Sequence, residues 1–197
     1  MTAAWQEDYD AFRSRDLSGR DYVYIDHAYA RAIEQAGGPV GNPWEERVEL
    51  RFDPSGGVAA LVGTVSNGQG HETIFARLVA ERLGIDPARV VVRQGDTDVS
   101  PFGRGSFGSR SMMVAGSAVE RACDKVIAKG GRIAAALLQA PPEAVRFADG
   151  TFSAEGAAGS LTLDEVIRAA FNVNALPPDM EGGLDSIATF LPPAPTY

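Results

Sequence analysis

Two glycine-rich loops, each lying between a predicted strand and a predicted helix, constrain this chain more than any other feature. The first spans residues 63–73 and the second spans residues 101–111. Glycines such as Gly68, Gly70 and Gly108 let the backbone turn sharply and let a ligand approach closely. The first turn of a helix presents unpaired N–H groups and partial positive charge, which favour anions. Taken alone, the second loop is equally typical of an ordinary glycine-rich loop with a serine cap and a solvated arginine. The presence of two such loops favours a shared site for one anionic ligand.

The residues around the first loop predict a β-hairpin, a helix and a further strand. Apolar and charged residues alternate over residues 47–53, a Pro-Ser-Gly-Gly turn follows, and residues 58–64 alternate again. Residues 73–83 place their apolar side chains on one helical face, and Gly84 is a suitable C-cap. The β-branched residues of segment 90–93 predict a strand in the interior of a sheet.

The residues after the second loop predict a long helix and then smaller elements. The apolar face of this helix extends from residue 112 to residue 138, and Gly130-Gly131 is expected to kink or split it. A small hairpin is predicted over residues 145–152. Residues 162–165 read Thr-Leu-Asp-Glu, a capping box that opens a helix ending near Phe171.

Together these elements predict an α/β fold of the α+β type. It has two layers, in which a twisted, mainly antiparallel sheet carries helices packed on one face, with both glycine loops at the same end. A doubly wound parallel sheet is the alternative, and the two hairpins disfavour it. We expect an N-terminal segment without a readable pattern over residues 1–46, a binding domain over residues 47–175 and a Pro/Gly-rich tail over residues 176–197.

Composition excludes several classes of partner. The net charge of −8 disfavours binding to nucleic acid or to an anionic membrane surface, because both select basic patches. The single cysteine, Cys123, permits no intramolecular disulfide, and its helical spacing from Val119 and Val126 predicts a buried thiol. There is no secretory signal pattern and no apolar run of membrane-spanning length, so we expect a cytoplasmic protein.

Three motifs, ordered and closely spaced, resemble the molybdopterin-binding domain of the molybdenum hydroxylases. They are Asn67-Gly-Gln-Gly-His-Glu-Thr73, Gln94-Gly-Asp-Thr-Asp98 and Pro101-Phe-Gly-Arg-Gly-Ser-Phe-Gly-Ser-Arg-Ser111. That family includes xanthine dehydrogenase, aldehyde oxidase, quinoline oxidoreductase and the large subunit of aerobic carbon monoxide dehydrogenase. The resemblance runs from about Val48 to Ala136. A triple motif of this kind is more specific than any single glycine loop.

The resemblance implies that the ligand is molybdopterin, with the cytosine dinucleotide as the expected form. It places Gln69 against the pterin–pyrophosphate part, the amides near Phe107 and Gly108 beside the molybdenum and pterin, and the Ser109 and Ser111 hydroxyls on the cofactor. Molybdenum is held through the pterin, so no metal ligand is expected from the chain. The expected cofactor-binding residues are Gly68, Gln69, Gly70, His71, Ser106, Phe107, Gly108, Ser109, Arg110 and Ser111.

For several polar residues a structural role competes with a functional one. His71 directly precedes a predicted helix, so orienting the loop is favoured over acting as a catalytic base, and Glu72 suits the helix dipole. For Arg110, a phosphate contact and a structural ion pair are equally favoured. Asp96 and Asp98 are expected to accept hydrogen bonds from loop N–H groups rather than to bind a metal.

The resemblance also sets what the chain is expected to lack. The family's catalytic base is a glutamate in a glycine-rich motif near the C-terminus of a much longer subunit, and no such motif occurs here. We therefore assign no catalytic residue and expect the isolated chain to be inactive. Its expected partners are the remaining segments of the molybdenum subunit together with subunits that carry iron–sulfur clusters and FAD.

The functional hypothesis is a fragment or subunit of a molybdenum hydroxylase that oxidises an aldehyde or an N-heterocycle. The alternative is a non-catalytic cofactor-binding or assembly module, or a truncated product without activity of its own. Because only two loops serve a ligand that needs donors along its whole length, we expect the isolated domain to purify without cofactor.

Overall fold

The computed structural model describes residues 45–100, 103–107 and 109–192. The expected N-terminal segment therefore lies almost entirely outside the described residues. The larger elements are β1 (Glu46–Phe52), β2 (Val58–Val62), α3 (His71–Leu83), β3 (Val90–Arg93), η2 (Ser111–Gly116), α4 (Ser117–Leu138), β4 (Val145–Ala148), β5 (Thr151–Ala154), β6 (Ser160–Thr162), α5 (Leu163–Ala170) and β7 (Ser186–Phe190). Short 3₁₀ turns occur at η1 (Pro87–Arg89), η3 (Pro142–Ala144) and η4 (Val173–Ala175).

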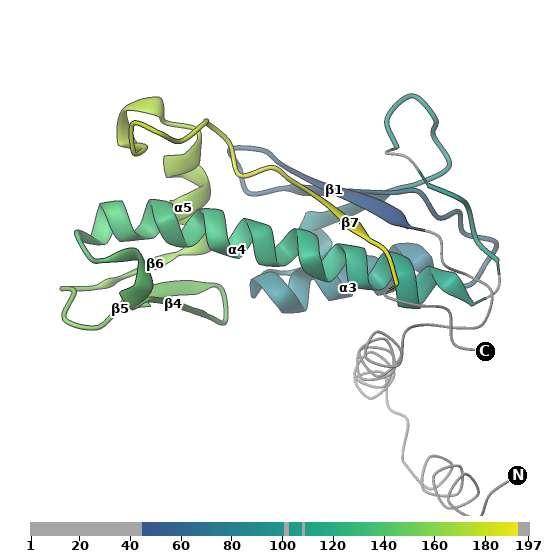
Figure 1. The fold of residues 1–197 in the computed structure, drawn as a ribbon, viewed down its shortest axis with the longest axis horizontal. Coiled ribbons are helices and arrows are strands. Elements are labelled where there is room, and N and C mark those ends of the chain that lie inside the picture. Colours follow the sequence, from purple (N-terminus) through teal and green to yellow (C-terminus); the bar gives the residue numbers. More distant parts are fainter. Residues whose placement is uncertain (1–44, 101–102, 108, 193–197) are drawn as a thin grey trace, which may run out of the picture.

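A four-stranded sheet in the order β3-β2-β1-β7 forms one layer of the fold. Strand β1 pairs antiparallel with both β2 and β7, whereas β2 and β3 pair in parallel. Figure 1 shows α4 running along the sheet with α3 beside it, on the same side of the sheet. The predicted two-layer α+β fold with a mainly antiparallel sheet is confirmed, and so is the hairpin formed by β1 and β2.

The core lies between this sheet and the two helices. Alternate residues of β1, namely Val48, Leu50 and Phe52, are buried, as the sequence pattern predicts. Helix α4 contributes a continuous buried stripe that includes Val119 and Val126. Cys123 is also fully buried, and burial raises the pKa of its thiol, so this cysteine is an inert core residue.

A second, three-stranded sheet packs near the C-terminal end of α4. Its order is β4-β5-β6, and all of its pairings are antiparallel. Phe152 of β5 is fully buried in the common core. The predicted capping box is present at the start of α5, where the Thr162 hydroxyl accepts from the Glu165 N–H and the Glu165 carboxylate accepts from the Thr162 N–H. In the described part of the chain, no helix is both long enough and apolar enough to cross a bilayer.

The predicted tail is wrong for residues 186–190, which form β7 and pair with β1. Ser186, Ala188 and Phe190 are buried on the core side, and the Ser186 hydroxyl donates to the Ala122 carbonyl at 2.9 Å. Two of these three inward side chains are small, so they give a weak apolar alternation. The glycines and prolines around them further obscure the strand pattern.

The expected interior position of residues 90–93 is also wrong. Strand β3 lies at an edge of the four-stranded sheet, and the Val91 side chain is 49% exposed. A run of β-branched residues indicates a strand, but it does not by itself distinguish an edge from the centre.

The predicted break at Gly130-Gly131 does not occur, because α4 continues through both glycines. Gly130 is buried against Phe152, and a Cβ added there would lie 2.7 Å from the Phe152 Cζ. Gly131 faces open space, where an added Cβ would meet nothing within 4 Å. Gly130 therefore lets β5 approach the helix closely. Gly131 has no such packing role, and it only lowers the helix propensity of the segment.

The two adjacent glycines make a matched pair for a stability test. We expect Gly130→Ala to destabilise the fold by about 1–3 kcal/mol, because the added methyl overpacks the Phe152 ring. Gly131→Ala should stabilise it by about 0.5–1 kcal/mol through helix propensity alone. Urea denaturation of the two variants measures both effects, and equal effects of the same sign would contradict this packing at the junction of α4 and β5.

Candidate functional site

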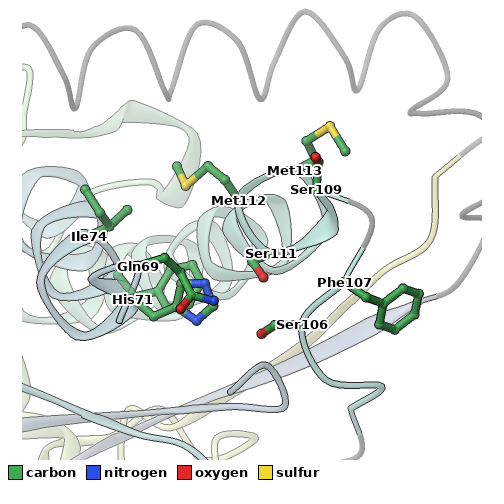
Figure 2. Close-up of a pocket in the computed structure, with 10 residues that line it drawn as sticks. Gln69, His71, Ile74, Ser106, Phe107, Ser109, Ser111, Met112 and Met113 are labelled. Atoms are coloured by element: carbon green, nitrogen blue, oxygen red, sulfur yellow. The ribbon is translucent and has the colours of Figure 1, made fainter. Parts of the chain in front are cut away.

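The two glycine loops meet at a pocket of about 440 Å³ at one end of the helices. Figure 2 shows Gln69 and His71 from the first loop and Ser106 and Ser111 from the second around the same space, whereas the Phe107 ring points away from it. The predicted convergence of the two loops is therefore confirmed. The lining residues are Gln69, His71, Ile74, Phe75, Ser106, Phe107, Ser109, Ser111, Met112 and Met113.

The Ser106 side chain joins the two loops directly. Its hydroxyl accepts a hydrogen bond from the Val65 N–H at 3.0 Å and donates one to the Val65 carbonyl at 2.5 Å. Nearby, a Cβ on Gly63 would lie 2.3 Å from the Gly103 Cα. The two backbones approach so closely that neither position accommodates a side chain without movement. Glycine at these two positions is thus a packing requirement of the pocket.

Other glycines serve backbone conformation and leave room for a ligand. Gly68, Gly70 and Gly105 all have positive φ, and a Cβ on any of them would meet nothing within 4 Å. Gln69 is held between two of them, with its side-chain oxygen accepting from the Asn67 N–H. Its amide NH₂ group is a donor that a ligand in the pocket can use.

The second loop enters its helix through a π-helical turn, η2, which precedes α4. Ser111 is the first residue of η2 and lines the pocket, and Ser109 adopts a left-handed backbone conformation with φ 58°. π-Helical turns are rare and occur frequently at functional sites. The predicted helix after the loop is confirmed, but its first turn is wider than an α-helical turn.

His71 lies at the start of α3 and is only 6% exposed. Its Nδ1 is buried and makes no hydrogen bond with the described residues. Burial lowers the pKa of the imidazole, while the neighbouring Gln94 side chain and the Glu72 charge act in the opposite direction. Gln94 also donates to the Glu72 carboxylate. At neutral pH, His71 is therefore an uncharged wall of the pocket.

Arg110 does not face the pocket, although it lies between two pocket-lining serines. Its side chain is fully buried, with Nη1 donating to a Glu46 carboxylate oxygen at 2.6 Å and to the Gly105 carbonyl at 2.7 Å. Of the two roles left open by the sequence, the structure shows the ion pair. This corrects the expectation that Arg110 binds the cofactor, because its guanidinium is directed to Glu46.

Glu46 is a structurally important residue that the sequence motifs do not contain. It is fully buried at the start of β1 and occupies the same inward register as Val48, Leu50 and Phe52. A glutamate at an inward position of an alternating strand is a signal of a buried partner. The apolar wall of the pocket, which includes Ile74 and Met112, was also not predicted, because the helical pattern alone does not separate apolar residues that face the core from those that line a pocket.

Asp96, which lies between β3 and the second loop, has a structural role. The Asp96 carboxylate accepts from the Asp98 N–H at 3.0 Å, as expected for a short side chain that stabilises a turn. Among residues 45–100, 103–107 and 109–192, no three His, Cys, Asp or Glu side chains are grouped so that they could hold a metal ion.

The sequence profile of one family, described as the molybdopterin cofactor-binding domain, matches residues 3–195. The carbon monoxide dehydrogenase large chain of Afipia carboxidovorans is 32% identical over 195 residues, which is 98% of this chain and 24% of that protein. The 6-hydroxypseudooxynicotine dehydrogenase complex subunit gamma of Paenarthrobacter nicotinovorans is 34% identical over 143 residues, covering 73% of this chain and 18% of that protein.

Solved structures give the same result. A crystal structure of Cu,Mo-CO dehydrogenase in its carbon monoxide reduced state superposes with a TM-score of 0.75 at 28% identity, covering 96% of this chain and 26% of that one. The chain thus spans about a quarter, or less, of the length of the proteins it matches.

The lowered pKa of His71 predicts how stability depends on pH. The ordinary histidine pKa is about 6.5, so as pH falls below that value the unfolded chain takes up a proton that the folded imidazole resists. The free energy of unfolding therefore decreases as the pH falls from about 6.5 towards the pKa of His71 in the folded protein, by at most about 1.4 kcal/mol per pH unit.

Urea denaturation between pH 7.5 and pH 5.5 tests this prediction. His71→Gln should lose less stability over that range than the unsubstituted chain, because glutamine does not titrate. Both proteins keep His27, so that residue cancels in the comparison. Parallel pH profiles would show that His71 is not buried in its neutral form.

Proposed function

We propose, from the premise that this chain belongs to the molybdopterin cofactor-binding domain family, that the pocket between its two glycine loops holds the pterin and pyrophosphate of molybdopterin in dinucleotide form. The observation that carries the proposal is the convergence of both loops on one pocket lined by hydroxyls, an amide and apolar side chains. Relatives that include a carbon monoxide dehydrogenase large chain and a subunit of a dehydrogenase complex support it.

The residues present fit such a group. The Ser109 and Ser111 hydroxyls and the Gln69 amide are donors for phosphate oxygens and pterin heteroatoms, whereas the Ser106 hydroxyl already donates to the Val65 carbonyl and holds the two loops together. The open space beside Gly68, Gly70 and Gly105 lets a flat ligand approach the backbone. The buried, unpaired Nδ1 of His71 is a further polar atom at this pocket.

The apolar side of the pocket complements the polar side. Ile74, Phe75, Met112 and Met113 provide a wall against which a heteroaromatic ring can pack. Pockets of a few hundred Å³ with an apolar wall and a few placed polar groups are typical of small-molecule and cofactor sites. We therefore assign orientation of the cofactor to the polar loops and burial of its ring system to the two helix starts.

Within a larger enzyme, the bound cofactor would supply molybdenum chemistry, namely hydroxylation of an electron-poor carbon. Aldehydes and N-heterocycles are the substrate classes that we propose, with iron–sulfur and flavin subunits as electron-accepting partners and a cytosine dinucleotide as the cofactor form. This chain's own residues bind the cofactor, orient it and exclude water from one side of it. We assign no proton transfer and no catalytic residue to them.

Analysis of bound metal and pterin tests the assignment. The chain is purified together with the proteins that associate with it, and molybdenum and the oxidised, fluorescent pterin are quantified against protein. We expect both in equal amounts. Pterin without turnover in every such complex would favour the non-catalytic module, and absence of molybdenum and pterin from all of them would contradict the proposal.

Removing hydroxyl groups from the second loop should weaken cofactor retention selectively. Hydrogen bonds to charged groups contribute about 1.5–3 kcal/mol each, so Ser109→Ala with Ser111→Ala should lower affinity on the order of 100-fold or more. Stability should change by less than about 0.5 kcal/mol per site, because neither side chain belongs to the buried core.

Ser153→Ala is the control, since Ser153 is an exposed residue of β5 remote from the pocket. It should retain the cofactor content of the unsubstituted chain. If the double variant unfolds, these serines have a structural role. If it keeps its full pterin content, they do not bind the cofactor. Either result would contradict the prediction.

A further inference from the structure

The two described arginines of the second loop are both directed to the start of β1. Arg110 pairs with Glu46 at 2.6 Å, and Arg104 pairs with Glu45 at 3.3 Å. Arg110 Nη2 also donates to the Glu45 backbone carbonyl at 3.2 Å. None of the described residues that line the pocket is an arginine or a lysine. The loop's positive charges are thus neutralised within the protein, away from the place where an anion would bind.

Glu46 contacts both glycine loops from one position. On one side its carboxylate holds Arg110, which in turn binds the Gly105 carbonyl of the second loop. On the other side it packs against Gly63 at the start of the first loop, where an added Cβ would lie 2.3 Å from Glu46 Oε1. The carboxylate and the guanidinium are both 0% exposed, so solvent does not screen the pair.

We propose that Glu46 is a positioning residue of the pocket, which braces the second loop against the first through Arg110, and that anionic ligands are bound there by neutral donors without help from the Arg110 charge. The part of this proposal that concerns ligands rests on the proposed function, whereas the bracing of the loop does not. In this proposal Arg110 orients Gly105, Ser109 and Ser111 of the second loop. The ligand then contacts the hydroxyl and amide groups of that loop and does not contact the arginine.

This brace and a direct phosphate contact predict opposite outcomes for one substitution. Glu46→Gln removes the partner charge and keeps the size of the side chain. If Arg110 were a ligand for the anion, freeing it would strengthen binding. If Arg110 is the brace, freeing it lets the second loop move, and binding weakens.

Pyrophosphate is the probe, titrated calorimetrically into the chain, and hydrogen exchange of the Gly105, Ser106 and Phe107 amides reports on the loop. We expect Glu46→Gln to weaken pyrophosphate binding by about tenfold or more, and to speed exchange at these amides by a similar factor, because the pair holds Arg110 in place to donate to the Gly105 carbonyl of the loop. Arg110→Lys keeps the charge but loses the forked geometry, so it should show both effects as well.

Asp164→Asn is the matched control. Asp164 pairs with Arg89 at 2.5 Å, remote from the pocket. This variant should leave both pyrophosphate affinity and exchange of the loop unchanged. Tighter pyrophosphate binding by Glu46→Gln, or unchanged exchange in that variant, would overturn the brace. If the unsubstituted chain does not bind pyrophosphate, the proposed anion site fails, and the exchange measurement still decides the brace.

A double variant covers the case in which one unpaired buried charge prevents folding. Replacement of both members by apolar residues of similar length, Glu46→Met with Arg110→Met, avoids that charge and is often nearly neutral for stability. The brace predicts faster loop exchange in this folded variant. A direct ligand role for Arg110 predicts weaker pyrophosphate binding with loop exchange unchanged, which would overturn the proposal.

Discussion

A fully buried guanidinium is tolerated in this domain because a fully buried carboxylate faces it. An isolated charge in a protein interior is strongly destabilising, and removal of one member of a buried pair typically costs about 3–5 kcal/mol. Arg110 and Glu46 lie 64 positions apart in the sequence, so their pairing fixes the second loop onto the first strand of the sheet. The position of the pocket follows from that contact, since Ser109 and Ser111 flank the arginine.

Much of this arrangement is readable from local patterns. The alternation in β1 and β2, the apolar face of α3 and the capping box of α5 all depend on neighbours in the sequence, and the structure has each of them. The glycine loops are recognisable for the same reason. Their convergence follows from both of them connecting strands to helices at one end of a two-layer fold.

Features that depend on distant partners were not predicted, or were predicted wrongly. Strand β7 has small inward side chains, and only its pairing with β1 makes it a strand. Gly130 continues the helix because Phe152 from another element occupies the space that a side chain would fill. The role of Arg110 could not be decided without Glu46, although a glutamate in an inward position of β1 was a signal that such a partner exists.

The π-helical turn η2 constrains how this loop can change in length. A π-helical turn contains about one residue more than an α-helical turn, so deletion of a single residue within 111–116 could be absorbed by conversion to an ordinary α-helix. Each residue of an α-helix advances by about 100° around the axis. Such a deletion would preserve α4 while rotating Ser111 and everything before it away from the pocket, so the register of the helix start is as important to the site as the chemistry of its side chains.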